Sequence, residues 1–149
     1  MEKTKQNLKW NSYLVLFFAA WTLVQLVVAL FCGNLDFSLL STEATEGMIL
    51  TAKIIVVAIS VLLLLPQVFV GCRGLQIAKN PTGTKTKAAL VWSVILLVIS
   101  VWGLVDPIIG IVKQTNVTDN VFLAFSNLAE AILFFDAIRL TKALTKDIQ

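Results

Sequence analysis

The sequence predicts an all-α membrane protein, an antiparallel up-down bundle of four transmembrane helices. Its 149 residues are 58% hydrophobic and 14% charged, with a mean hydropathy of +0.86. Soluble domains are nearer to half apolar and a quarter charged. The apolar residues also gather in four long runs, and the basic residues cluster between alternate runs. Together these three observations indicate a single four-span membrane domain over residues 1–149.

Each apolar run contains roughly 20 or more residues, enough to cross a hydrocarbon core of about 30 Å as a helix. A β-barrel would need shorter, alternating segments. Lysines precede the first run as in a signal peptide, but the run is too long for one and no small-x-small cleavage site follows. We therefore interpret it as a retained span. The predicted spans are about 13–32, 48–70, 88–112 and 121–140.

The basic residues orient these spans. Ten of the twelve Lys and Arg residues fall in the N-terminus, in the loop between spans two and three, or in the C-terminus. The loop 33–47 has three acids and no base. By the positive-inside rule, both termini and the central loop face the cytoplasm of a plasma membrane. Residues 141–149 are expected to continue the fourth span as a short cytoplasmic helical tail.

The central basic loop, residues 71–87, carries Arg73, Lys79, Lys85 and Lys87. Its simplest interpretation is an orientation signal with a tight turn at the sequence NPTG. The alternative is a contact site for anionic lipids or a partner protein, since juxtamembrane bases attract anionic headgroups by about 1 kcal/mol each.

Polar residues inside the spans are the candidate functional residues, because an ionisable group there costs about 2.5–3.5 kcal/mol to insert. Lys53 and Asp106 lie at similar depths below the outer ends of spans two and three, and Gln25 lies near that level in span one. We expect a Lys53–Asp106 ion pair with Gln25 nearby. This pair would hold the helices together, or it would form a ligand or ion site. Alternatively, the Lys53 side chain extends outward to the membrane interface.

Glu130 lies near the middle of span four, with no basic residue at its depth and Asn127 three residues earlier on the same face. We expect a neutral carboxyl group that hydrogen bonds to Asn127 or to another helix. The alternative is a proton- or cation-coupled site. Gln67 is a further polar residue in span two. Asp136 is expected to pair locally with Arg139.

Two prolines fall inside spans, Pro66 and Pro107. Each removes one backbone donor and leaves a carbonyl, that of Leu62 or Gly103, without its helical partner. Such a carbonyl accepts a hydrogen bond from a ligand, from water or from a neighbouring helix.

Catalytic and cofactor chemistry is not indicated. The chain has no His and two cysteines, Cys32 and Cys72, which the topology places on opposite membrane faces. No nucleophile–base set and no metal-ligand cluster is present. We therefore expect no enzyme activity, no metal, no cofactor and no nucleic-acid binding.

The stretch GLQIAKNPTGTKTKAALVWSVILLVISVWGLVDPIIGI covers the basic loop and span three. It resembles small, uncharacterised four-helix membrane proteins of Gram-positive anaerobic bacteria. The resemblance implies a bacterial plasma membrane and brings no assigned activity.

Two functions fit these features. The first is an accessory or immunity-type subunit that packs against another membrane protein, which the short loops and the absence of catalytic sets favour. The alternative is an oligomeric transporter or channel for ions or small molecules, which would use Glu130 and assemble as a homo-oligomer.

Overall fold

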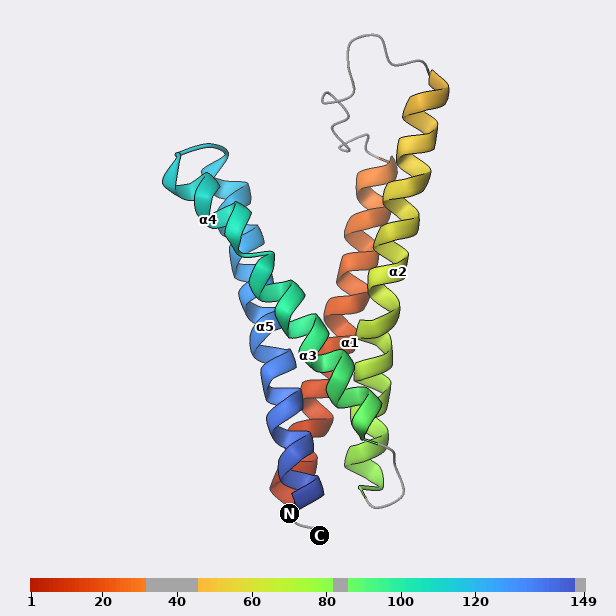
Figure 1. Ribbon diagram of the computed structural model, residues 1–149, viewed down its shortest axis with the longest axis vertical. Coiled ribbons are helices and arrows are strands. Elements are labelled where there is room, and N and C mark those ends of the chain that lie inside the picture. The colour runs from red at the N-terminus through yellow and green to blue at the C-terminus, as the bar shows by residue number, and fades with distance from the viewer. Residues whose placement is uncertain (32–45, 82–85, 147–149) are drawn as a thin grey trace.

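The computed structural model describes residues 1–31, 46–81 and 86–146, and its regular secondary structure there is entirely helical. The helices are α1 (Glu2–Phe31), α2 (Glu46–Lys79), α3 (Lys87–Trp102), α4 (Val105–Val112) and α5 (Val117–Lys146). Figure 1 shows their arrangement. Four stretches are long and apolar enough to cross a membrane, with α3 and α4 together forming the third. The all-α prediction is confirmed.

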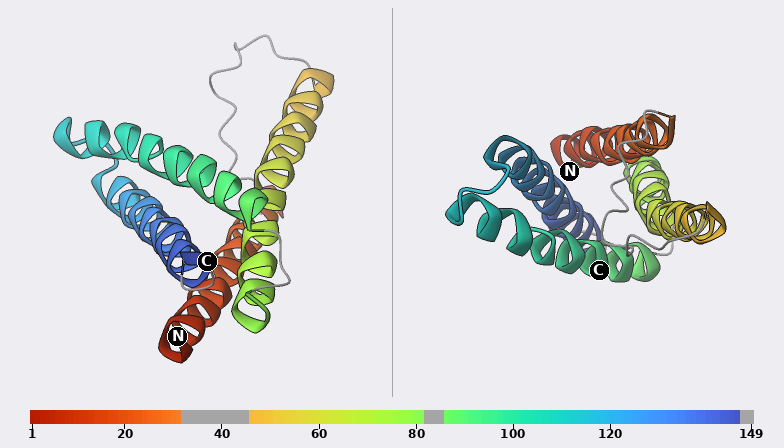
Figure 2. Two further views of the ribbon diagram at one scale, coloured as in Figure 1. Left: turned by 60° about the horizontal axis from the view of Figure 1, so that its bottom comes forward. Right: turned by 90° about the horizontal axis from the view of Figure 1, so that it is seen from above.

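The helices form two arms that meet at one end and diverge towards the other (Figure 1). Helices α1 and α2 form one arm, and α3, α4 and α5 form the second. The arms are joined mainly through α1, which packs against α5, and α3, which packs against α2. Seen from above, α1 and α2 lie opposite α3 and α5 (Figure 2). The start of α1 and the end of α5 both lie where the arms meet. We call this the terminal end, and the other the open end.

The helices extend beyond the predicted spans at the terminal end. Helix α1 begins at Glu2, and α2 continues to Lys79. The predicted loop 71–87 is therefore too long, because its first nine residues are helical. A helix that leaves a membrane needs no apolar side chains to continue, and the first proline after the predicted span is Pro81. The rest of the predicted NPTG turn lies outside the described residues.

The third span is interrupted where the sequence places Pro107. Helix α3 ends at Trp102, Gly103 and Leu104 form a turn, and α4 starts at Val105. Since Pro107 has no N–H, the carbonyl of Gly103 has no donor four residues later. Pro66, in contrast, lies within the continuous helix α2.

Two apolar clusters close the bundle at the terminal end, and each takes side chains from all four spans. The first contains Leu8, Ile77, Ala78, Ala89, Leu140 and Leu144. The second, about two turns farther along the helices towards the open end, contains Val15, Val70, Leu96 and Phe134. Within a membrane such contacts stabilise through close packing, because lipid tails are as apolar as the side chains.

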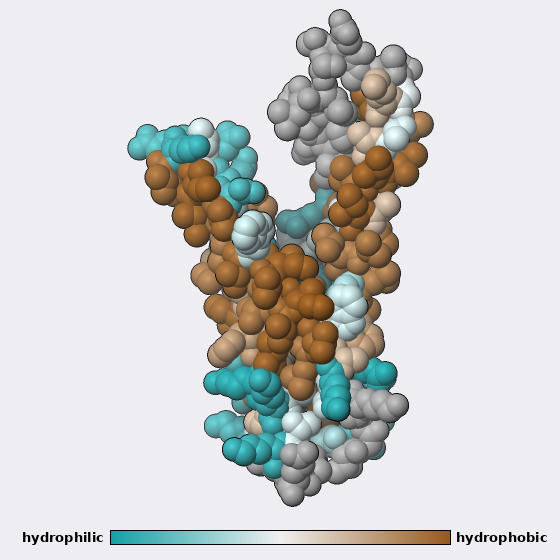
Figure 3. Space-filling model, viewed as in Figure 1, coloured by the Kyte–Doolittle hydropathy of each residue, from teal (hydrophilic) through white to brown (hydrophobic). Residues whose placement is uncertain are grey.

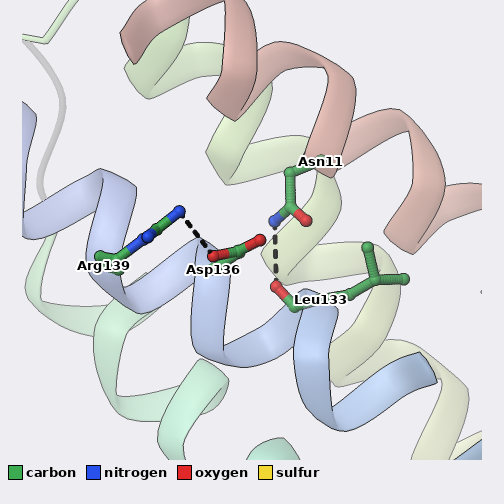
Figure 4. Close-up of polar contacts among 4 residues, drawn as sticks. All are labelled: Asn11, Leu133, Asp136 and Arg139. Atoms are coloured by element: carbon green, nitrogen blue, oxygen red, sulfur yellow. Dashed lines mark hydrogen bonds and ion pairs between the residues drawn. The ribbon is translucent and has the colours of Figure 1, made fainter. Parts of the chain in front are cut away.

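Helices α1 and α2 are in close contact at two glycines. A Cβ added at Gly71 would lie 2.6 Å from the Leu16 Cγ, and one added at Gly74 would collide with the Ser12 hydroxyl. Small residues allow this approach of two backbones. Helix α1 is also tied to α5, because the Asn11 Nδ2 donates a 3.0 Å hydrogen bond to the Leu133 carbonyl (Figure 4).

The outer surface of the spans is strongly apolar. In the most hydrophobic 18-residue window of α2, 6% of the residues are buried within the chain. Figure 3 shows the apolar surface on both arms, with hydrophilic residues at the terminal end and at the tip of the second arm. An apolar surface of this extent requires contact with lipid or with another protein.

Candidate functional site

The candidate site is a cleft between the two arms, with a volume of about 290 Å³. Every span contributes polar side chains to its lining. These are Thr22 and Gln25 of α1, Ser60 and Gln67 of α2, Ser100 of α3, and Ser126, Asn127 and Glu130 of α5. Figure 3 shows a notch between the arms at the open end, with hydrophilic atoms at its base.

The second apolar cluster closes the cleft towards the terminal end. Gln67 lies three residues from Val70 in α2, and Glu130 lies four residues from Phe134 in α5. Each polar residue therefore stands about one helical turn from the apolar cluster, on the side of the open end. The cleft is open at one end and blocked at the other by packed side chains.

Glu130 connects three helices at the base of the cleft. The Gln67 Nε2 of α2 donates a hydrogen bond of 3.3 Å to the Glu130 Oε2. Ser100 of α3, which is 4% exposed, lies within reach of this carboxyl group. Of the two arrangements expected from the sequence, Glu130 adopts the second: it bonds to another helix and not to Asn127.

One buried acceptor of the cleft is unused among the described residues. The Gln67 Oε1 is buried and has no partner among the described residues. A buried acceptor left unpaired costs roughly 1–3 kcal/mol. No lysine or arginine lines the cleft among the described residues, so the Glu130 carboxyl group has no cation beside it. The site is therefore best matched to a group that donates hydrogen bonds or carries positive charge.

Asn127 has a different role from the one that its position beside Glu130 suggested. Its Nδ2 donates a 2.8 Å hydrogen bond to the Gly103 carbonyl. That carbonyl is the one that Pro107 leaves without a helical donor. A neighbouring helix thus satisfies the freed carbonyl, which is one of the outcomes that the sequence left open. Asn127 still lines the cleft.

The predicted Lys53–Asp106 ion pair is not present. Among the described residues, Arg139 with Asp136 is the ion pair that forms. Lys53 lies in α2 and Asp106 in α4, and these helices belong to different arms that diverge towards the open end (Figure 1). Matching depths did not bring the two side chains together. Gln25, which was expected beside them, instead lines the cleft that contains Glu130.

The predicted local pair of α5 is confirmed. The Arg139 Nη2 lies 3.0 Å from the Asp136 Oδ1 (Figure 4). Both side chains retain contact with the surroundings, at 65% and 35% exposed. Asp136 lies outside the lining of the cleft. It therefore provides a paired carboxylate on the same helix as Glu130, in a different environment.

Three of the four basic residues predicted to contact lipid or a partner lie in helices that the structure describes. Arg73 lies within α2, where its guanidinium donates to the Gln76 Oε1 at 2.9 Å and stands 5.6 Å from the centre of the Phe69 ring. Lys79 is the last residue of α2, and Lys87 is the first of α3. Lys85 lies outside the described residues.

Sequence reasoning missed the hydroxyl side chains of the cleft. Thr22 and Ser60 each donate to a carbonyl four residues earlier, at 3.0 and 2.8 Å, as such residues do in any apolar helix. Because this bonding is common, the sequence did not mark these residues as part of a site. One signal was available: Ser60 and Gln67 are seven residues apart, and that spacing puts them on one face of α2.

The fold and cleft together define the class: a helical protein with four stretches able to cross a membrane and a polar site between them. Within the part of the chain that the structure describes, no group of three His, Cys, Asp or Glu side chains could hold a metal ion. No protein-family model, curated protein or solved structure matches the chain. The resemblance of residues 74–111 to small bacterial four-helix proteins stays an expectation.

Proposed function

We propose that the protein is a non-enzymatic accessory subunit of a membrane-protein complex, and that a transmembrane helix of its partner enters the cleft. The observation that carries the proposal is the polar lining, with side chains from all four spans around Glu130. Lipid tails cannot hydrogen bond with these groups. A protein helix with one or two polar residues can do so, while its apolar residues cover the diverging faces of the arms.

In this proposal the chain is a multi-pass, up-down protein of the plasma membrane with cytoplasmic termini. Two observations support that orientation. The start of α1 and the end of α5 lie at the same end of the molecule, and most Lys and Arg residues belong to segments at that end. The cleft would then open towards the outer half of the bilayer. The partner helix would approach from within the membrane.

The chemistry of the cleft specifies what the partner helix carries. A carboxyl group inside the hydrocarbon region is stabilised by a cation or by hydrogen-bond donors. No Lys or Arg lines the cleft in the part of the chain that the structure describes, and the Gln67 Oε1 has no donor there. A Lys or Arg on the partner helix would satisfy both groups, since each has several N–H donors and a positive charge.

The test is native mass spectrometry of the intact particle, extracted in nanodiscs directly from the membrane of its native host. We expect a stoichiometric foreign subunit with the wild-type chain, a partly occupied complex with Glu130→Gln, and no complex with Glu130→Lys. The matched control is Asp136→Asn, which removes a carboxylate from the same helix. This variant should bind as much of the partner subunit as the wild type does. A wild-type particle that contains no foreign subunit would refute the accessory role. Full partner occupancy in Glu130→Lys would refute the role of the cleft.

A second candidate is an oligomeric transporter, and one observation favours it. The cleft is open at one end and closed at the other by Val15, Val70, Leu96 and Phe134. Carriers that alternate access have this arrangement in each of their end states. Four spans are few for a transport pathway, so this candidate requires a homo-oligomer. It predicts that proton- or ion-dependent flux in proteoliposomes is lost in Glu130→Gln; flux equal to wild type in that variant rules it out.

A further inference from the structure

A second hollow lies at the terminal end, on the surface between α1 and α2. Its volume is about 720 Å³. Helix α1 contributes Lys5, Gln6, Lys9 and Tyr13, and α2 contributes Leu75, Ala78 and Lys79. We call it the terminal groove. None of the described residues lines both this groove and the polar cleft.

The sequence spacing explains why these side chains converge. Lys5, Lys9 and Tyr13 recur every four residues, so they form one stripe along α1. Close contact of the two helices at Gly71 and Gly74 brings α2 beside that stripe. The chain direction reverses between the helices, and this sets Lys79, at the end of α2, near the start of α1.

The groove combines positive charge with an apolar wall. Three ammonium groups line it, and no carboxylate does so among the described residues. Leu75 and Ala78 provide an apolar wall, while Tyr13 offers an aromatic ring with a hydroxyl group. An aromatic ring of this kind is typical of the level of the lipid headgroups. The set matches a molecule with an anionic head and an apolar tail.

We propose that the terminal groove binds an anionic phospholipid, with its phosphate among Lys5, Lys9 and Lys79 and its glycerol and first acyl carbons along Tyr13 and Leu75. A free phosphate would use the lysines alone and leave the apolar wall uncovered, so the lining favours the lipid. Arg73 takes no part, because its guanidinium is engaged with Gln76 and Phe69. The lipid site thus uses the N-terminal lysines that sequence analysis treated only as orientation signals.

The proposal shares with the proposed function only the placement of the terminal end at a membrane surface. It needs no partner protein and does not involve Glu130. The two can therefore fail separately: the lipid test uses the purified chain alone, whereas the partner test uses the complex from the native membrane.

The experiment titrates the purified full-length chain in detergent with phosphatidylglycerol and counts bound lipids by native mass spectrometry. Phosphatidylcholine and inorganic phosphate serve as the comparison probes. We expect the triple variant Lys5→Gln/Lys9→Gln/Lys79→Gln to bind phosphatidylglycerol about a hundredfold more weakly, since each juxtamembrane base contributes about 1 kcal/mol. The triple variant with Arg at these positions should retain binding.

The matched control removes three charges elsewhere, as Lys3→Gln/Lys142→Gln/Lys146→Gln, and should bind as the wild type does. If the two triple Gln variants lost the same affinity for phosphatidylglycerol, binding would depend on overall charge and not on the groove. That result would overturn the proposal. Equal affinity of the wild type for phosphatidylcholine would overturn it too. Competition by millimolar inorganic phosphate would assign the groove to free phosphate instead. Circular dichroism of each variant checks that its helices are intact. The single variant Lys79→Gln repeats the phosphatidylglycerol titration with the loss of one charge.

Discussion

The hydrogen bond between Asn127 and Gly103 gives the sharpest test of the structure. The Gly103 carbonyl needs this bond because Pro107 has no N–H to donate. Asn127→Leu removes the donor with little change in side-chain volume. Interhelical hydrogen bonds in membrane proteins average about 0.6 kcal/mol and reach about 1.7. Because the bond is short and partly buried, we expect a loss of about 1 kcal/mol in unfolding free energy.

A second substitution isolates the physical cause. In Pro107→Ala, the new backbone N–H can donate to the Gly103 carbonyl, so Asn127 becomes redundant. Asn127→Leu should then cost only the packing difference, and the double-mutant cycle should show a coupling of about 1 kcal/mol. The assay is reversible unfolding of the four proteins in mixed detergent micelles. If Asn127→Leu costs the same in both backgrounds, within about 0.3–0.5 kcal/mol, the proline does not create the need for the asparagine and the reasoning is refuted.

The contacts between helices predict two more stability changes in the same assay. Gly74→Val should destabilise the protein by about 1–3 kcal/mol, because its added carbon atoms collide with Ser12. Gly47→Val should be tolerated, because none of the described residues comes within 4 Å of a Cβ added there. Equal losses would contradict the close approach of α1 and α2. Asn11→Ala should lower the free energy of unfolding by about 1 kcal/mol, because it loses the hydrogen bond to α5. Asn7→Ala, at an exposed position, should lower it by less than about 0.5 kcal/mol. Equal effects would contradict a stabilising bond between α1 and α5.

The helical spans could be predicted because their cause is local. A run of apolar residues in a bilayer has to satisfy its own backbone, and a helix is the structure that does so within one segment. The helix ends were less predictable, since hydropathy marks the edge of the membrane and not the end of the helix. Helix α2 shows this, because it continues beyond Val70 to Lys79.

At the break between α3 and α4, the sequence predicted the unpaired acceptor but not its donor. Pro107 identifies the Gly103 carbonyl as an acceptor without a helical donor, and this follows from covalent structure alone. The identity of the donor depends on how α5 packs against α3 and α4. Sequence placed Asn127 on the same face as Glu130, yet it could not show that the amide turns to a backbone carbonyl and leaves Glu130 to Gln67.

The Lys53–Asp106 prediction failed for a related reason. Depth in the membrane fixes one coordinate of a residue, whereas a contact also needs facing helices and facing sides. The cleft residues had the same depth information, with Gln25, Gln67 and Glu130 all inside spans. They line one cavity because the helices that carry them converge towards the terminal end.

The hydrogen bonds between the two arms indicate how the cleft would respond to an occupant. Two side-chain hydrogen bonds cross between the arms, those of Asn11 to Leu133 and of Gln67 to Glu130. The first lies beside the apolar clusters, where the arms are packed. The second is 3.3 Å long, beyond the usual range of about 2.7–3.2 Å for an N–H···O bond, and lies at the base of the cleft. A donor that enters the cleft therefore competes with a weak bond, and by taking the Glu130 carboxyl it would release Gln67 without disturbing the packed terminal end.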